Sequence, residues 1–81
     1  MRLQNRVKDK GENMKLQNRL KDTRQKHNLT QEDLAKAVEV TRQTIIAIEK
    51  GKFGPTVTLA LAIARVLEVN VEDLFWLDSD H

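Results

Sequence analysis

The stretch LTQEDLAKAVEVTRQTIIAIEKG, residues 29–51, decides the fold of this chain. Thr30 is a good N-cap for a helix, and Asp33 follows three residues later, as in a capping box with a shorter acid. Thr41 is a second N-cap candidate, and Gly51 is a natural stop for the helix that Thr41 opens. The stretch therefore predicts two short helices that are joined by a short turn.

The turn predicts how these two helices are arranged. Two short helices meet at a steep angle only where the residues at the crossing are small, and Ala35 is well placed for that. We expect Val40, in the turn, to be buried between the helices. This arrangement is a helix-turn-helix, in which the second helix, Arg42–Lys50, is presented outward toward the major groove of DNA.

The side chains of this second helix separate into two faces. One face carries Ile45, Ile48 and Glu49, and the opposite face carries Arg42, Gln43, Ile46, Ala47 and Lys50. Gln43 can form a bidentate pair with adenine, and Arg42 can pair with guanine or contact a phosphate. Ala47 and Ile46 offer apolar atoms to a thymine methyl, although Ile46 fits an ordinary exposed apolar residue equally well.

Further polar groups suit contacts with phosphates. Lys50 and Lys52 stand at the end of the second helix, where their charges can meet the DNA backbone. Gln31 stands in the first turn of the first helix, and we expect its side chain to be free for a phosphate beside the positive helix N-terminus. The two helices together predict both base-reading and backbone-contacting chemistry.

Several segments resemble the phage Cro and repressor-type helix-turn-helix family, the XRE-like regulators. These segments are LTQEDLA at 29–35, VTRQTI at 40–45, IEKGKFGPT at 48–56, and the pattern P-T-x-x-x-A-x-x-I-A-x-x-L from Pro55. The resemblance covers about Leu16 to Phe75. It implies an all-α fold, a compact five-helix bundle of the lambda-repressor-like kind, which binds operator DNA as a two-fold dimer.

The resemblance also implies roles for particular residues. Its DNA-contacting positions match Gln31, Thr41, Arg42, Gln43, Thr44, Ala47, Lys50 and Lys52. Its buried structural ion pair matches Arg24 and Glu49. The chain departs from the family at the turn, where Glu39 stands in place of a frequent glycine, at a cost of about 1 kcal/mol if the backbone is left-handed there.

Three more helices are expected outside the central stretch. The first spans Leu16–Asn28, on a moderate one-faced pattern, and the last is a short helix Val71–Phe75. Between them, Thr56 caps a helix that runs to Glu68. This helix is apolar nearly all round, so we expect it to be the central and most buried element.

The N-terminus contains a near-repeat, because residues 1–9 match residues 14–22 at seven of nine positions. We interpret residues 1–13 as an N-terminal extension, either a mobile solvated tail or a basic arm that adds DNA contacts. The helix-turn-helix domain is then residues 14–77, with a short strand at the termini as an open alternative. Residues 78–81 form an acidic tail.

Four large apolar residues in a row, Leu74–Leu77, suggest a surface for a second copy of the chain. We expect homodimerisation through this C-terminal region, at Val69, Val71, Leu74, Phe75, Trp76 and Leu77. Such a dimer would place two recognition helices roughly 34 Å apart, one turn of DNA. In the alternative arrangement, Trp76 and Leu77 fold back on the first helix or pair with residues 15–17 as a strand.

Composition and charge exclude several other classes of protein. The 81 residues carry a net charge of +2, which divides into +6 for residues 1–52 and −4 for residues 53–81. A basic pole of this kind suits a polyanion. The chain has no cysteine, no apolar run of the roughly 20 residues that span a membrane, and no signal-peptide core, so we expect a cytoplasmic protein.

These observations predict a sequence-specific regulator of transcription that binds double-stranded DNA. We expect a dimeric repressor that reads the major groove with Arg42–Lys50. The two histidines have no second ligand at metal spacing and no catalytic constellation is present, so we expect no cofactor, no metal and no enzymatic activity. The alternatives are an antitoxin-type autorepressor and a protein–protein adaptor with the same fold.

Overall fold

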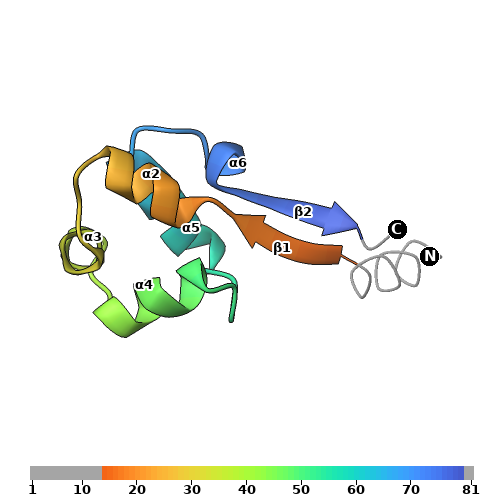
Figure 1. The fold of residues 1–81 in the computed structure, drawn as a ribbon, viewed down its shortest axis with the longest axis horizontal. Coiled ribbons are helices and arrows are strands. Elements are labelled where there is room, and N and C mark those ends of the chain that lie inside the picture. Colours follow the sequence, from red (N-terminus) through yellow and green to blue (C-terminus); the bar gives the residue numbers. More distant parts are fainter. Residues whose placement is uncertain (1–13, 80–81) are drawn as a thin grey trace.

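A two-stranded hairpin and five short helices make up the part of the chain that the computed structural model describes, residues 14–79. In chain order the elements are β1 (Met14–Asn18), α2 (Leu20–Lys26), α3 (Gln31–Ala37), α4 (Arg42–Glu49), α5 (Val57–Val66), α6 (Val71–Leu74) and β2 (Phe75–Ser79). The helices gather into one body, from which the hairpin projects (Figure 1). The predicted five-helix fold is confirmed, together with the strand at the termini.

Threonine caps fix where the three central helices begin. The hydroxyls of Thr30, Thr41 and Thr56 each accept a hydrogen bond from the backbone N–H three residues ahead. At α3 the capping box is complete, because the Thr30 N–H also donates to Asp33 Oδ2 at 2.9 Å. The helix starts predicted from these threonines are confirmed.

Left-handed residues end the helices α2 to α5. The residues with positive φ are Asn28 (58°), Glu39 (61°), Gly51 (75°) and Glu68 (57°). At each end, the next N–H donates back to a carbonyl five residues earlier, as Val40 N–H does to the Ala35 oxygen at 2.9 Å. This is the Schellman arrangement, and it lets each helix turn into the next one within a few residues.

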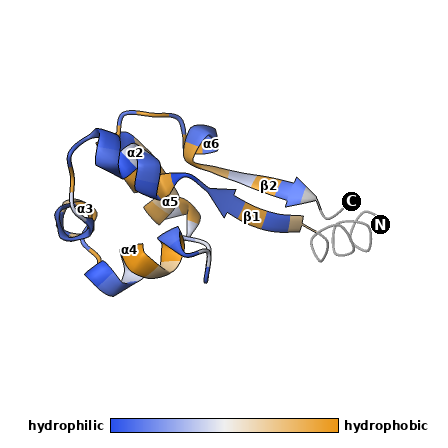
Figure 2. Cartoon of the chain, in the orientation of Figure 1, coloured by the Kyte–Doolittle hydropathy of each residue, from blue (hydrophilic) through white to orange (hydrophobic). Residues whose placement is uncertain are grey.

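The core is built from one buried face of each helix. Its buried residues are Leu20, Leu34, Ala35, Ile45, Ile48, Ile63, Ala64, Leu67 and Leu74. Ala35 supplies the small side chain that was expected at the crossing of α3 and α4, and Val40 in the turn packs against the core. Figure 2 shows α2 and α3 as mainly hydrophilic and α5 as mainly hydrophobic.

The N-terminal boundary of the first helix was predicted wrongly. Met14–Asn18 form β1, which pairs antiparallel with β2, so that Gln17 faces Trp76 and Met14 faces Ser79. Helix α2 starts only at Leu20, whose N–H donates to Asn18 Oδ1 at 3.0 Å. The Asn18 side chain also donates to the Ile48 carbonyl at 3.1 Å, which holds the end of the strand against α4. The alternative in which the C-terminal residues pair with residues 15–17 is confirmed.

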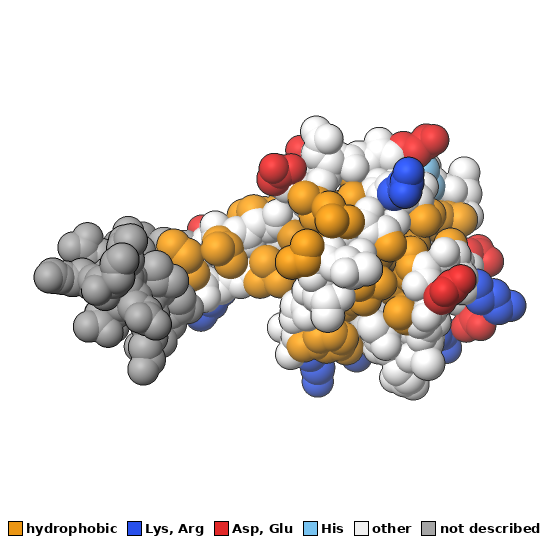
Figure 3. Space-filling model, turned by 180° about the vertical axis from the view of Figure 1, so that it is seen from behind, with side chains coloured by type: hydrophobic (Ala, Val, Ile, Leu, Met, Phe, Trp, Pro, Cys, Tyr) orange, Lys and Arg blue, Asp and Glu red, His pale blue; other side chains and the backbone are white. Residues whose placement is uncertain are grey.

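Helix α5 was expected to be the most buried element, and this is also wrong. Ile63, Ala64 and Leu67 face the core, but Val57 is 76% exposed and Leu61 is 54% exposed. These two residues are four positions apart, so they lie on one side of the helix, which no element of residues 14–79 covers. Hydrophobic side chains at the surface of the helical body are visible in Figure 3.

The C-terminal boundary also lies further along the chain than predicted. Asp78 and Ser79 belong to β2 and not to an acidic tail. The predicted extension, residues 1–13, and the last two residues, 80–81, lie outside the described residues. No helix in residues 14–79 is long and apolar enough to cross a membrane.

Candidate nucleic-acid interface

Helix α4 presents the two faces that the sequence predicted. Ile45 and Ile48 are buried in the core. On the opposite side, Arg42 and Gln43 are exposed, as is Lys50 at the C-cap of the helix. The buried isoleucines therefore fix the rotation of α4 and turn its polar side chains toward solvent.

The remaining DNA-contact candidates lie around this exposed face with different accessibility. Thr41 and Lys52, at the two ends of α4, are exposed, whereas Thr44, Ile46 and Ala47 are half-buried. The Thr41 hydroxyl accepts a hydrogen bond from the Thr44 N–H at 3.3 Å, and the two threonine hydroxyls lie 3.1 Å apart. These threonines thus form the cap of α4 as well as part of its surface.

An ion pair anchors α4 to α2. Arg24 Nε donates to Glu49 Oε2 at 2.7 Å, and a second guanidinium nitrogen donates to Glu49 Oε1 at 3.2 Å. The two side chains are 8% and 5% exposed. The third guanidinium nitrogen of Arg24 donates to the Leu29 carbonyl at 2.9 Å, so all the charged atoms have partners. A bidentate, buried pair of this kind holds the helix in one orientation.

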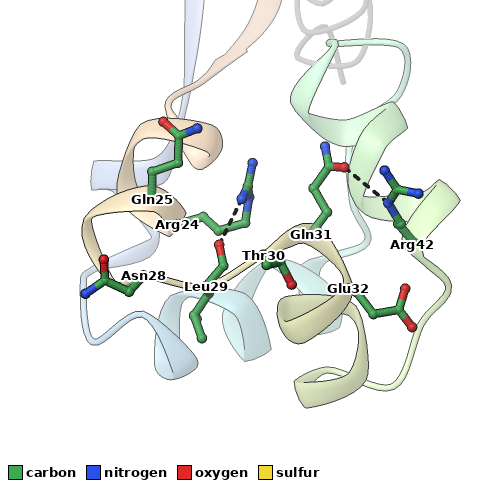
Figure 4. A pocket seen from close by; sticks show the side chains of 8 residues that line it. All are labelled: Arg24, Gln25, Asn28, Leu29, Thr30, Gln31, Glu32 and Arg42. Atoms are coloured by element: carbon green, nitrogen blue, oxygen red, sulfur yellow. Dashed lines mark hydrogen bonds between the residues drawn. The ribbon is translucent and has the colours of Figure 1, made fainter.

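Gln31 was expected to have a free side chain, and this is wrong. Its amide nitrogen donates to Glu49 Oε1 at 3.2 Å, and its amide oxygen accepts from Arg42 Nε at 3.3 Å. The cause is the helix-turn-helix crossing, which brings the first turn of α3 alongside α4. Gln31 therefore connects the buried Arg24–Glu49 pair to the exposed Arg42. Figure 4 shows its hydrogen bond with Arg42. Gln31 lies 11 residues from Arg42 and 18 residues from Glu49 in the sequence, so no local pattern predicts these two hydrogen bonds.

An open groove of about 740 Å³ runs beside this network. It is lined by Arg24, Gln25, Asn28, Leu29, Thr30, Gln31, Glu32 and Arg42. The side chains of Arg24, Gln31 and Arg42 lie around it in Figure 4. The backbone N–H of Thr30, which donates to the Asp33 carboxylate, lowers the pKa of Asp33, with smaller lowering contributions from the Thr30 side chain and from Lys36. The acid at this helix start is thus kept ionised as part of the cap.

In residues 14–79, no three His, Cys, Asp or Glu side chains are grouped closely enough to hold a metal ion. His27, one of the two histidines, places Nδ1 3.1 Å from the Thr23 carbonyl, which is an intrahelical contact. The chemistry that these residues offer is hydrogen bonding and positive charge.

The helix-turn-helix geometry agrees with a match to a known family. The Helix-turn-helix family model HTH_3 matches residues 20–74, from the start of α2 to the end of α6. The chain belongs to the XRE-type helix-turn-helix family. Members of this family regulate transcription by binding DNA. In this helix-turn-helix regulator the two helices of the motif are α3 and α4.

Relatives of this helix-turn-helix regulator occur in archaea and bacteria. An uncharacterized HTH-type transcriptional regulator of Methanocaldococcus jannaschii is 59% identical over 54 residues, which cover 67% of this chain and 82% of the relative. One from Archaeoglobus fulgidus is 51% identical over 57 residues, covering 70% and 80%. The regulator YgzD of Bacillus subtilis is 43% identical over 58 residues, covering 72% and 88%.

The residues predicted for a dimer interface are spread over different environments in this helix-turn-helix regulator. Leu74 is fully buried in the core of the protomer, so its assignment to a surface is wrong. Val69, Val71 and Phe75 are half-buried against the same core. Trp76 and Leu77 are exposed, and the Arg19 guanidinium stacks 4.8 Å from the centre of the Trp76 ring. The four apolar residues Leu74–Leu77 therefore do not form a single exposed surface patch.

Proposed function

We propose that this chain is a sequence-specific repressor of transcription that binds double-stranded DNA as a homodimer. In this proposal α4 enters the major groove and reads base edges, and the dimer occupies a two-fold symmetric operator. The observation that carries the proposal is the orientation of α4. One side of the helix is locked by the core and by the Arg24–Glu49 pair, and the other side presents Arg42, Gln43 and Lys50 to solvent.

Base reading is assigned to the exposed side chains in the first turn of α4. The amide of Gln43 has the donor and acceptor that pair with adenine, and the guanidinium of Arg42 can pair with guanine. Arg42 is held by Gln31, and a side chain with a fixed direction loses less freedom when it contacts a base. Thr44 and Ala47 line the same surface and suit the thymine methyl or the DNA backbone.

Backbone contacts are assigned to the residues around the ends of α3 and α4. Lys50 and Lys52 are exposed at the C-terminal end of α4 and supply charge for phosphates. Thr41 and Gln31 lie at the N-terminal ends of α4 and α3, where polar side chains of HTH proteins contact the sugar-phosphate backbone. These contacts set the position on DNA and make the affinity fall with salt.

A selection for bound sequences from random duplex DNA tests the proposal directly. The expected product is a preferred sequence with two-fold symmetry and half-sites about 10 base pairs apart. The same selection with Trp76→Ala serves as a matched control, because Trp76 lies on the hairpin and not on the recognition helix. Recovery of unselected sequences by the intact chain at low salt would remove the proposal.

A further inference from the structure

Three side chains form a chain of hydrogen bonds that leads from the interior of the protein to the exposed face of α4. Glu49 Oε1 accepts from Gln31 Nε2 at 3.2 Å, and Gln31 Oε1 accepts from Arg42 Nε at 3.3 Å. The Glu49 side chain is 5% exposed, Gln31 is half-buried and Arg42 is exposed. A buried carboxylate is therefore connected through one amide to a guanidinium that faces solvent.

The two ends of this chain fix the orientation of the Gln31 amide. The Glu49 carboxylate, which is paired with Arg24, can only accept hydrogen bonds, and the Arg42 guanidinium can only donate them. The NH₂ group of Gln31 must therefore face Glu49, and its carbonyl oxygen must face Arg42. Turning the amide by half a rotation would place two acceptors together at one end and two donors together at the other, so both hydrogen bonds would be lost.

The contact with Gln31 restricts the direction of the Arg42 guanidinium. Within residues 14–79, Nε is the only nitrogen of this guanidinium that has a hydrogen-bond partner. Since the group is planar and its donors form a rigid fork, a partner for Nε also orients the two terminal nitrogens. Figure 4 shows the hydrogen bond with Gln31 and the terminal nitrogens of Arg42 beyond it. These nitrogens are the donors that can pair with the two acceptors on the edge of guanine.

We propose that Glu49 and Gln31 are positioning residues for base recognition by Arg42, and that Glu49 acts through the orientation of the Gln31 amide. The proposal rests on the DNA-binding function proposed above. It gives Glu49 a part in the choice of DNA sequence, in addition to its structural ion pair with Arg24. Gln43, the next residue of α4, has no hydrogen bond to this chain within residues 14–79, so base recognition by Gln43 should be independent of it.

A contact between Gln31 and a phosphate has a different consequence from positioning. Loss of a phosphate contact weakens binding to every duplex by the same factor, because the DNA backbone carries no sequence information. Loss of positioning weakens binding only to duplexes that contain the base pair that Arg42 reads. The quantity that separates the two roles is the ratio of the affinities for the operator and for a duplex changed at that one base pair.

Gln31→Met tests the positioning role, because methionine has a similar length and makes no comparable hydrogen bond. Fluorescence anisotropy is measured with the operator selected by the unmodified chain and with its single-base variants. The base pair read by Arg42 is the one at which Arg42→Ala loses discrimination. Gln31→Met should lower the discrimination there by about tenfold and leave it unchanged at the base pair that Gln43 reads. In a chain that already carries Arg42→Ala, it should cause no further loss of discrimination.

Gln25→Met is the matched control. Gln25 lines the same groove as Gln31 and Arg42, and in the described part of the chain its side chain has no hydrogen bond to α4. The same substitution there should leave discrimination unchanged at every base pair. The proposal is overturned if Gln31→Met weakens binding to all duplexes equally, or if Gln25→Met loses as much discrimination as Gln31→Met.

The part played by Glu49 is tested by the double variant Arg24→Met with Glu49→Met, which leaves no buried charge without a partner. In this variant Gln31 has no acceptor at the inner end of the chain, so its amide can turn. Discrimination at the base pair read by Arg42 should fall by the same factor as in Gln31→Met, and circular dichroism reports whether the fold is kept. Full discrimination in the folded double variant would overturn the role of Glu49.

Nuclear magnetic resonance of the full chain without DNA tests the hydrogen bonds themselves. Exchange of the Arg42 Nε proton with water should be several times faster in Gln31→Met than in the unmodified chain, and unchanged in Gln25→Met. Equal exchange rates in all three proteins would overturn the proposal, and they require neither an operator nor the double variant. An unmodified chain that selects no DNA sequence, but shows the expected exchange rates, would instead overturn the proposed function.

Discussion

Arg24 and Glu49 face each other in the interior of the protein, with Nε of the arginine 2.7 Å from Oε2 of the glutamate. The pair connects α2 to the last residue of α4. Because Gln31 donates to the same carboxylate and also accepts from Arg42, Glu49 helps to fix both the orientation of α4 and the direction of its first side chain.

Glu49→Gln should destabilise the fold by about 3–5 kcal/mol, because the substitution leaves the Arg24 guanidinium buried without a counter-charge. Unfolding in urea measures the change. Asp22→Asn, on the exposed side of α2, is the control and should change stability by less than about 0.5 kcal/mol. The double variant Arg24→Met with Glu49→Met should recover most of the loss; a double variant as unstable as Glu49→Gln would contradict the assignment of the loss to an unpaired charge.

Glu39→Gly should stabilise the fold by about 1 kcal/mol, because Glu39 has a φ of 61° and glycine adopts this conformation without strain. Thermal unfolding measures the change. Glu32→Gly is the matched control, since Glu32 lies within α3, where glycine should cost about 1 kcal/mol. Opposite signs for the two substitutions are expected, and equal signs would argue against a left-handed Glu39.

The capping carboxylate predicts a pH dependence of stability. The pKa of Asp33 is lowered in the folded state, so the ionised carboxylate stabilises the fold. This stabilisation is fully present above the unfolded carboxyl pKa of about 3.9 and is lost as the pH falls through the lower pKa of the folded state. The stability difference between the unmodified chain and Asp33→Asn should therefore shrink as the pH falls below about 4. Thermal unfolding between pH 7 and pH 2 measures it, and a difference that is constant with pH is the contrary result.

Gln43→Ala should lower the affinity for the selected operator by roughly 1–3 kcal/mol and relax the choice of base at one position of each half-site. Fluorescence anisotropy with the operator and with single-base variants measures this. Gln17→Ala is the control, because Gln17 lies on β1. Equal losses on operator and random duplex would show that Gln43 contacts only the backbone.

Lys52→Ala should weaken binding to operator and random duplex by the same factor, because a phosphate contact carries no sequence information. The slope of the logarithm of affinity against the logarithm of salt concentration should fall by about 1 in magnitude. Lys36→Ala, on exposed α3, provides the comparison and should leave the slope unchanged. An unchanged slope for Lys52→Ala would remove this residue from the interface.

Local signals in the sequence predicted the helix-turn-helix well. Thr30, Thr41 and Thr56 act on backbone groups within three residues, so the starts of their helices could be located from the sequence. The two faces of α4 followed from its periodicity, which placed Ile45 and Ile48 on the core side. Both kinds of signal operate within one turn of helix.

The predictions that failed depend on contacts between distant parts of the chain. Residues Met14–Asn18 become a strand because β2 lies beside them, and their own pattern allowed a helix equally well. The sequence of an apolar helix such as α5 shows that the helix is hydrophobic, but it does not show how many other elements cover it. The bridge made by Gln31 similarly requires that α3 and α4 cross, which sets the distance between residues far apart in sequence.

The pairing of Met14 with Ser79 brings the two ends of the described chain side by side at the tip of the hairpin. A short flexible linker between these positions would close the backbone into a ring without crossing α3 or α4 (Figure 1). New ends could then be opened in the exposed loop at Lys52–Gly54. Such a circular permutant would move any fused reporter from the tip of the hairpin to the C-terminal end of α4.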